Sequence, residues 1–420
     1  MKSIILVDLP ALDTTQDVYI KGFIFPTFTE KYLAPLLSQA GMSVTYVNLN
    51  QGNIEEKLEY ILQAGHEVYT HLTANKHYSY RLFRRLINRK ILVGGPLPKF
   101  RPELFEEDVL IDTELEEDGI LQYFNMAKRS LWSDDSFVPS RPKRHFSNQT
   151  IEADFSEIVL FNRGCRYKCK FCIHSAFHKS MHTRGVKSIE YELGMYANEP
   201  VQLYIADPSI NNLLILNDII ALLKSFDNIS YSMNIRADQI NPALLARITD
   251  LKIDKLYIGV ESLDDAQLNR YSKGETVATI TSRINLVKEY GIPYHLSFII
   301  SDNMDIHQFM TFHHLVNAAS YSFHFYLPYP GTTAGGPIST NWFMDKNWPE
   351  NISKLVSNSA AIKQQLTQLM NYPSNSYHTI TPHDHSLTFL KIRENLEVLE
   401  RMAEPAIRSE SKGRAHEYFR

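Results

Sequence analysis

Short apolar runs of strand length alternate with stretches whose apolar residues recur at helical spacing along the first part of the chain. Strands are predicted at residues 4–7, 44–47, 68–72 and 91–93, and helices at 29–40, 54–64 and 78–87. Strands and helices that alternate in this way are typical of an α/β fold, in which helices cover both faces of a parallel sheet. The pattern therefore predicts a doubly wound, Rossmann-like domain over residues 1–130.

A second alternating block follows a polar, proline-bearing stretch, which we assign to a linker at residues 131–150. Its strands are predicted to begin near Ile158, Val201, Ile229, Lys255, Tyr294 and Ser322. Its clearest helix has one apolar face, formed by Val277, Ile280, Ile284 and Val287. Six such units, rather than the eight of a closed barrel, predict a partial βα barrel over residues 151–335. Residues 336–420 are polar and helical in pattern and are assigned to a helical C-terminal extension.

Composition and charge narrow the range of partners. The chain has 420 residues, of which 44% are apolar, and a net charge of -4, which is ordinary for a globular protein and does not indicate a nucleic-acid partner. The longest apolar runs fall far short of the roughly 20 residues of a membrane-spanning helix, and the N-terminus does not read as a secretory signal. We therefore expect a cytoplasmic protein with no membrane partner.

All three cysteines of the chain, Cys165, Cys169 and Cys172, fall within eight positions after the first strand of the second block. An odd, clustered set argues against a disulfide framework and for a thiolate site in a reducing compartment. Three thiolates on one loop leave a zinc ion or a four-iron cluster one ligand short, so a substrate or cofactor can bind at the open position. The alternatives are a structural zinc completed by His174 or His178, and three unrelated structural cysteines.

The cysteine spacing, with the aromatic Phe171 directly before the third cysteine, resembles the signature of the radical S-adenosylmethionine (SAM) superfamily. The resemblance implies a 4Fe-4S cluster bound by Cys165, Cys169 and Cys172, with SAM on the fourth iron and Phe171 among the cofactor contacts. It further implies reductive cleavage of SAM to methionine and a 5'-deoxyadenosyl radical, which abstracts hydrogen from an unactivated carbon. An electron donor such as flavodoxin or ferredoxin would then be a partner.

Polar residues at the next two strand ends are candidate SAM contacts. Asp207 could accept a hydrogen bond from the SAM ammonium group, although Asp-Pro is also a helix-start signal. The run Asn234-Ile-Arg236 ends the third strand, where Arg236 offers a planar fork for a carboxylate; a surface arginine is the alternative.

The fourth strand ends in a segment that resembles the ribose-contacting segment of the superfamily, because Glu261 and Ser262 could hydrogen-bond to sugar hydroxyls. Lys273 resembles the basic site for the SAM carboxylate, with a solvated lysine as the competing interpretation. Glu275 is expected on a helix surface.

Residues 327–332, with the sequence Leu-Pro-Tyr-Pro-Gly-Thr, resemble the closing segment of radical enzymes that carry an N-terminal cobalamin-binding domain. The two-domain order matches theirs, and the resemblance covers roughly residues 1–335. One departure follows the fifth strand, where residues 300–303 replace the glycine-proline-glycine turn of that group.

Cobalamin itself is left open by the sequence. The turn at Gly94 and Gly95 lets the backbone approach a ligand, or is a tight turn only. Residues 9–22 contain no histidine for the Asp-x-His-x-x-Gly pattern, so cobalamin would bind base-off without a protein histidine ligand. A sheet domain that has lost the cofactor is the equal alternative.

The cysteine count limits the reaction. Auxiliary iron-sulfur clusters, and methylation through a modified cysteine, both require thiolates outside the motif, and the chain has none. The sequence predicts an enzyme that modifies an unactivated carbon of a metabolite, a natural-product intermediate or a small peptide. The alternatives are a cobalamin-dependent methyltransferase and a non-catalytic protein that binds a cluster or zinc. His383 and His385 are interpreted as a surface turn rather than a metal pair.

Overall fold

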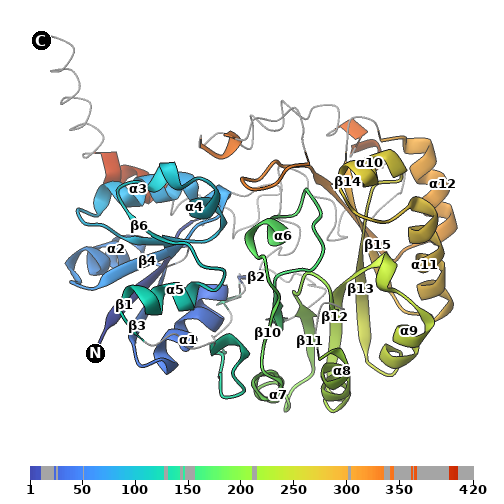
Figure 1. The fold of residues 1–420 in the computed structure, drawn as a ribbon, viewed down its shortest axis with the longest axis horizontal. Coiled ribbons are helices and arrows are strands. Elements are labelled where there is room, and N and C mark those ends of the chain that lie inside the picture. The colour runs from blue at the N-terminus through green and yellow to red at the C-terminus, as the bar shows by residue number, and fades with distance from the viewer. Residues whose placement is uncertain are drawn as a thin grey trace, which may run out of the picture.

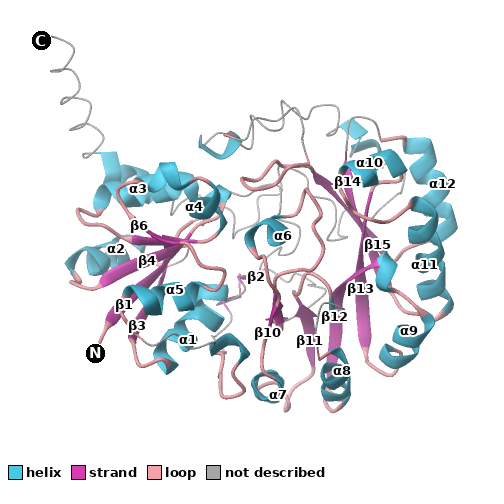
Figure 2. Ribbon diagram, in the orientation of Figure 1, coloured by secondary structure: helices cyan, strands magenta, loops and turns pink. Residues whose placement is uncertain are grey.

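The computed structural model describes residues 1–10, 23–24, 27–50, 52–126, 131–141, 145–146, 157–210, 215–300, 304–334, 341–344, 361–362, 364–366 and 397–404. Two parallel sheets stand side by side, each packed against helices (Figures 1 and 2). The altered turn at 301–303, the histidines at 383 and 385 and most of the predicted extension lie outside the described residues. Those parts of 336–420 that are described include helical pieces at 361–362, 364–366 and 397–404.

The N-terminal sheet is entirely parallel and has the strand order β3-β1-β4-β5-β6. Its strands are β1 (Ser3–Asp8), β3 (Ser43–Asn48), β4 (Glu67–His71), β5 (Leu92–Gly94) and β6 (Val109–Ile111). Its helices are α1 (Ala34–Gln39), which continues a π-helical turn at Thr29–Leu33, α2 (Ile54–Gln63), α3 (His77–Leu86), α4 (Pro96–Phe100) and α5 (Glu116–Tyr123). The strand order reverses between β1 and β4, which makes the carboxyl ends of these strands the switch point of a doubly wound sheet.

Alternation along β1 explains why both faces of this sheet are covered. Ile5 and Val7 pack into one hydrophobic core and Ile4 and Leu6 into another, because successive side chains of a strand point to opposite faces. The predicted Rossmann-like domain is therefore confirmed. The short strand β6 was not predicted, since three apolar residues in an acidic context carry little periodicity.

The second sheet has six parallel strands in the order β15-β14-β13-β12-β11-β8, which is the predicted partial barrel. These strands are β8 (Glu157–Val159), β11 (Val201–Ile205), β12 (Ile229–Arg236), β13 (Ile253–Glu261), β14 (Tyr294–Ile300) and β15 (Ser320–Phe325). The helices outside it are α7 (Val186–Gly194), α8 (Leu216–Lys224), α9 (Pro242–Ile248), α10 (Asp265–Arg270), α11 (Val277–Glu289) and α12 (Ile306–Val316). Helix α11 buries Ile280, Ile284 and Val287, as its spacing predicts.

Two short antiparallel pairs complete the fold. Strand β9 (Asn162–Arg163) pairs with β10 (His182–Thr183), and the loop between them carries the cysteines and helix α6 (Ile173–Phe177). Strand β2 (Phe23–Ile24) pairs with β7 (His145–Phe146). Across the described residues, no helix combines the length and apolar character needed to cross a membrane.

Buried charges join the two halves. Glu192 on α7 forms ion pairs with Lys31 of the N-terminal half at 2.7 Å and with Arg184 at 2.5 Å. All three side chains are almost fully buried. Tyr32 also donates to Glu192, at 3.1 Å. Burial raises the pKa of Glu192, but the two cations outweigh it and hold the pKa below its ordinary value. A buried carboxylate that depends on partners from both halves fixes their relative position.

The segment assigned to a linker takes part in this interface. Trp132 and Phe137 are buried in the core of the N-terminal half, and the guanidinium of Arg163 lies 4.1 Å from the ring centroid of Trp132. Arg163 also forms a buried ion pair with Glu117 of α5. Residues 131–141 of this stretch therefore pack between the two halves.

Candidate functional site

The three cysteines lie around one pocket. None of the three forms a disulfide; Cys169 is buried, and Cys165 and Cys172 are partly exposed. The pocket has a volume of about 470 Å³, and its described lining contains no carboxylate. Gly164 starts the loop with φ +90°, and a Cβ there would collide with the carbonyl oxygen of Ser180, so the loop can begin only at a glycine.

Distant segments hold the cysteine loop in shape. The N–H of Lys170 donates to the carbonyl of Tyr271 at 2.9 Å, and the carbonyl of Lys170 accepts from the N–H of Thr333 at 2.9 Å. The Phe171 ring packs edge-on against Tyr271, with centroids 5.4 Å apart. Phe171, predicted to contact the cofactor, therefore anchors the loop on the segment that follows α10.

A buried arginine faces the central cysteine. Arg236, at the end of β12, donates through Nη1 to Sγ of Cys169 at 3.4 Å, and its guanidinium lies 3.8 Å from the ring centroid of Tyr167. Its other donors reach Asp238 at 3.2 Å and the carbonyl of Lys273 at 2.5 Å. Burial raises the pKa of Cys169, although the nearby charges of Lys273 and Arg236 oppose this. The planar fork predicted to suit a carboxylate is paired with the carboxylate of Asp238, while Nη1 faces the thiol.

Charged side chains form a network beside this contact. Lys273 is buried and lies 3.3 Å from Glu261 and 3.4 Å from Glu275, and Glu275 also lies 3.3 Å from Arg236. Burial lowers the pKa of Lys273, but the two carboxylates outweigh it, so the net direction is upward. Glu275 was expected on a helix surface, and this prediction was wrong: its side chain is fully buried beside the two cations.

Gly259 makes room for this network. A Cβ at Gly259 would collide with Oε1 of Glu261 and lie 3.1 Å from Nζ of Lys273. Glu261 itself has φ +67°, an unusual conformation for a residue with a side chain, which marks a locally strained backbone at the end of β13. The glycine and the strained glutamate together place the lysine.

Buried Asp207 and half-buried Asn234 form hydrogen bonds that join strand ends. Oδ1 of Asp207 accepts from the N–H groups of Phe161 and Asn162 at 2.8 and 3.1 Å, and Asn234 donates to the carbonyl of Asp207 at 2.8 Å. Oδ2 of Asp207 has no hydrogen-bond partner among the described residues. Burial raises the pKa of Asp207 to about 7, against the effect of the two N–H donors.

Ser262 lies on the rim of a separate, small hollow. Its hydroxyl accepts from the N–H of Asp264 at 3.1 Å, and with Glu261 it lines a pocket of about 30 Å³. The structure thus brings Arg236, Glu261 and Lys273 together at the cysteines and places Ser262 just beyond them.

A second pocket, of about 340 Å³, lies between the carboxyl edge of the N-terminal sheet and the cysteine loop. One wall carries His71, Pro96 and Glu116, and the other carries Ile173, Phe177 and His178; His178 also lines the cysteine pocket. Burial raises the pKa of Glu116, but His71 and Tyr69 outweigh it and hold that pKa to about 2.

The glycine turn predicted to approach a ligand is packed against protein. A Cβ at Gly94 would lie 2.5 Å from the hydroxyl of Tyr69, and one at Gly95 would lie 2.8 Å from the carbonyl oxygen of Leu72 and 2.9 Å from the ring of His71. Gly95 also has φ +95°. Neighbouring side chains and backbone thus account for both glycines.

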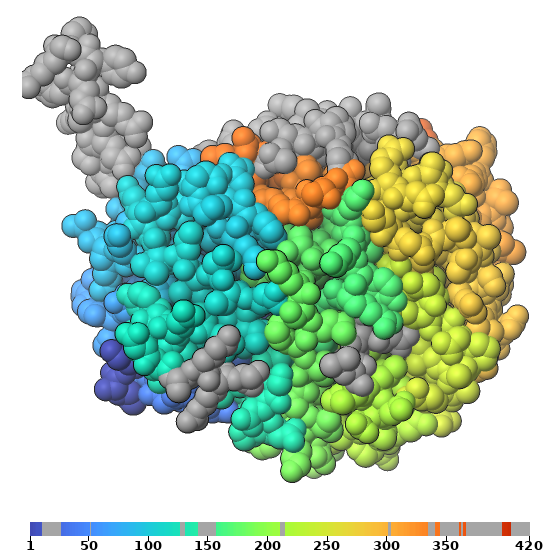
Figure 3. Space-filling view, in the orientation of Figure 1, coloured from blue at the N-terminus to red at the C-terminus, as the bar shows by residue number. Residues whose placement is uncertain are grey.

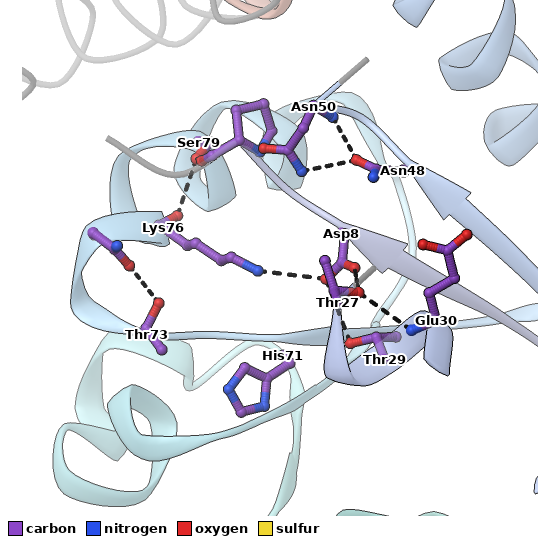
Figure 4. A network of polar contacts seen from close by, with 12 residues as sticks. Asp8, Thr27, Thr29, Glu30, Asn48, Asn50, His71, Thr73, Lys76 and Ser79 are labelled. Atoms are coloured by element: carbon purple, nitrogen blue, oxygen red, sulfur yellow. Dashed lines mark hydrogen bonds and ion pairs between the residues drawn. The ribbon is translucent and has the colours of Figure 1, made fainter. Parts of the chain in front are cut away.

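The switch point of the N-terminal sheet holds a polar network (Figure 4). Asp8, at the end of β1, accepts from Thr27, from Tyr46 at 2.7 Å and from Lys76 at 3.4 Å. Burial raises the pKa of Asp8, but Lys76 and the hydroxyl donors bring it below its ordinary value. The anionic end of β1 is therefore satisfied by the protein's own side chains.

Sequence reasoning missed three residues of the site. Tyr167 stacks on Arg236 and accepts a hydrogen bond from Gln239, which in turn accepts from Ser209 at 2.7 Å. Glu275 is the third. Tyr167 lies between the first two cysteines, which is the one sequence signal that could have identified it.

Comparison with known proteins identifies the domain that carries the cysteines. Residues 159–320, which contain the cysteine loop and the strand ends described above, match the family model described as the radical SAM superfamily. This part of the chain is therefore a radical SAM domain. This confirms the assignment from the cysteine motif, and the family implies a 4Fe-4S cluster and SAM as cofactors.

The individual proteins that the chain resembles share low sequence identity with it. The chain is 26% identical over 267 residues to 4'-phospho-dehydrooxetanocin synthase of Priestia megaterium, a match that covers 51% of this chain and 36% of the synthase. The structure of TsrM from Kitasatospora setae, a methyltransferase with tryptophan substrate and a SAM analogue bound, has a TM-score of 0.61 at 13% identity and covers 97% of this chain and 100% of TsrM.

The structure of OxsB, a cobalamin-dependent radical enzyme with aqua-cobalamin and SAM bound, has a TM-score of 0.57 at 17% identity and covers 96% of this chain and 62% of OxsB. At these identities the likeness shows the fold. It confirms the predicted order of a Rossmann-like domain followed by a partial barrel.

Proposed function

We propose that this radical SAM enzyme binds a 4Fe-4S cluster through Cys165, Cys169 and Cys172, cleaves SAM reductively and modifies an unactivated carbon of a small molecule or peptide. The observation that carries the proposal is that three cysteines, none of them in a disulfide, line one pocket in the matching domain. When bound, the cluster would supply the electron that splits the sulfonium of SAM.

The donor set fits such a cluster. Three thiols surround a pocket without carboxylates, while no group of three His, Cys, Asp or Glu side chains in the described chain converges as the ligands of a single metal ion do. Arg236 donates to one thiol and would hold the corresponding cluster ligand in position. This fit favours a cluster over a mononuclear zinc.

Residues of the barrel would position SAM beside the cysteines. We assign Lys273 to the carboxylate of SAM. Glu261 and Glu275 hold the ammonium group of Lys273 in place at 3.3 and 3.4 Å. Ser262 and Glu261 would face the ribose hydroxyls. Asp207 and Asn234 act as positioning residues, because their hydrogen bonds fix the ends of β8 and β11.

We propose a division of the chain into a Rossmann-like domain at 1–130, a connection at 131–150, a partial barrel at 151–335 and an extension at 336–420. Buried ion pairs across the connection support a fixed arrangement, in which the first domain forms a wall of the site. Residues on both sides of that wall line the pocket of about 340 Å³.

Cobalamin-dependent methyl transfer is the second candidate, because the likeness in fold to TsrM and OxsB extends over both domains. The described residues do not fit a corrin as they stand. Cobalamin is far larger than the ligands held by pockets of roughly 300–1,000 Å³, and Tyr69, His71 and the Asp8 network fill the sheet edge. Cobalamin binding would require this edge to open.

Anaerobic reconstitution with iron and sulfide tests the proposal. We expect about four irons per chain, visible sulfur-to-iron absorption, and 5'-deoxyadenosine after addition of SAM and a reductant. Cys169→Ala should abolish the product. S-adenosylhomocysteine formed with added hydroxocobalamin would favour the methyltransferase, whereas bound zinc, or a cluster that never cleaves SAM, would favour a non-catalytic binding protein.

A further inference from the structure

The cysteine loop carries a set of cations that have no acidic partner among the described residues. Arg166, Lys168, Lys170 and Lys179, which we call the basic collar, are all exposed and all line the cysteine pocket. Within the described part of the chain, none of them forms an ion pair. The whole chain has a net charge of -4, so the collar is a local concentration of positive charge on an acidic protein.

The collar is accessible. Figure 3 shows the cysteine loop and α6, in green, at the surface between the orange segment near residue 330 and the yellow helix α10. Cys165 and Cys172 are partly exposed within this surface. A molecule that touches the collar therefore comes close to the thiols.

The proposed function requires one electron from outside for each SAM cleaved. The chain has three cysteines, all in this loop, so it has no thiolates that could hold a second cluster as a relay. The electron must therefore enter at the loop itself, where the protein surface is cationic.

We propose that the basic collar is the docking surface for an acidic electron-transfer protein, an inference that rests on the proposed function. In the complex, one electron passes from the donor, which is oxidised, to the cluster, which is reduced. Opposite charges accelerate such encounters, and small transient interfaces are typical of redox partners. Three of the four collar residues are lysines, whose strongly hydrated ammonium groups suit a contact that must also separate quickly.

The test uses the reconstituted full chain and two reductants of opposite character. One is a reduced acidic flavodoxin, and the other is the radical cation of methyl viologen. Cluster reduction is followed by the loss of visible absorption after rapid mixing, a readout that does not depend on SAM cleavage. The variant is Lys168→Glu with Lys179→Glu, and the control is Lys90→Glu, which reverses an exposed lysine before β5.

We expect the flavodoxin-driven rate to fall about tenfold or more in the double variant and to be unchanged in the control. In the unaltered protein it should also fall when salt rises from about 0.1 to about 1 M, which shortens the screening length from roughly 10 to 3 Å. The viologen-driven rate should not fall in either variant.

Two results would overturn the proposal. One is a flavodoxin-driven rate that changes neither with salt concentration nor with charge reversal. The other is an equal loss with viologen at full iron content, which would assign the collar to the substrate or to SAM. If the double variant binds less iron, the same rates are measured on the single variant Lys179→Glu, which lies outside the cysteine motif. Failure of the proposed function is separate, since the unaltered cluster would then be reduced without forming 5'-deoxyadenosine.

Discussion

The guanidinium of Arg236 donates to the sulfur of Cys169 at 3.4 Å while resting on the ring of Tyr167. A hydrogen bond from a cation stabilises the more negative state of a thiolate-bound cluster, because reduction adds negative charge at the sulfurs. We expect Arg236→Gln to shift the midpoint potential of the reconstituted cluster to more negative values by an amount on the order of 60 mV, equivalent to about 1.4 kcal/mol.

Potentiometric titration followed by electron paramagnetic resonance checks this expectation. Arg236→Lys keeps the charge and should recover part of the shift, although it loses the planar fork. A potential unchanged in both variants would show that the contact is only structural.

Gly259→Ala should disturb the Lys273 site. The added Cβ collides with Glu261 and crowds Nζ of Lys273, so the ion pair must move. We expect a several-fold higher Kd for SAM, measured by equilibrium dialysis with the anaerobic protein. Gly194→Ala on α7 is the matched control: its Cβ meets nothing within 4 Å, and it should leave binding unchanged while stabilising the helix by up to about 1 kcal/mol.

Asp207 predicts a pH dependence of stability. Its pKa rises from an ordinary 3.8 to about 7 on folding, so the folded state holds the proton more tightly than the unfolded state. The contribution of Asp207 to the free energy of unfolding has its full value below about pH 4. It is lost as pH rises toward 7, by roughly 4 kcal/mol at most. Urea unfolding at about pH 5 and pH 8 should show a smaller loss for Asp207→Asn than for the unaltered protein. Parallel profiles would contradict the assignment.

The buried carboxylate between the two halves gives the largest expected effect on stability. Lys31→Met leaves Glu192 with one cation fewer in a buried site, at a cost of about 3–5 kcal/mol in the free energy of unfolding. Lys224→Met removes an ion pair of the same 2.7 Å length to Asp250, but in a solvent-exposed setting, and should cost less than about 1 kcal/mol. Denaturant titration compares the two, and similar losses would refute the buried-charge explanation.

Local patterns predict those parts of the fold that depend on local physics. Runs such as Ile4 to Val7 identify strands because burial on both faces of a parallel sheet demands continuous apolar residues. The same reasoning overlooks Val109–Ile111, which is too short to show a period, and treats Trp132 as part of a linker because its neighbours are polar.

The part of the site that could be predicted is the part that depends on the spacing of residues along the chain. Three cysteines on one loop require no knowledge of distant contacts. By contrast, the partners of Arg236 and Glu275 come from strands and loops that are far apart in the chain, and helical periodicity after Val277 says nothing about them. Ion pairing across strand ends is a tertiary property.

The contact between Lys170 and Thr333 has a consequence for how the protein matures. The loop that bears the thiols is fastened by a segment made more than 150 residues later, and Gly331 in that segment packs so closely on Phe100 that a Cβ would lie 2.6 Å from the ring. Until residues 333 and 334 have been synthesised, the loop lacks the hydrogen bonds that they donate to the carbonyl of Lys170. We therefore expect iron and sulfide to be inserted after synthesis has passed residue 334, when these hydrogen bonds can form.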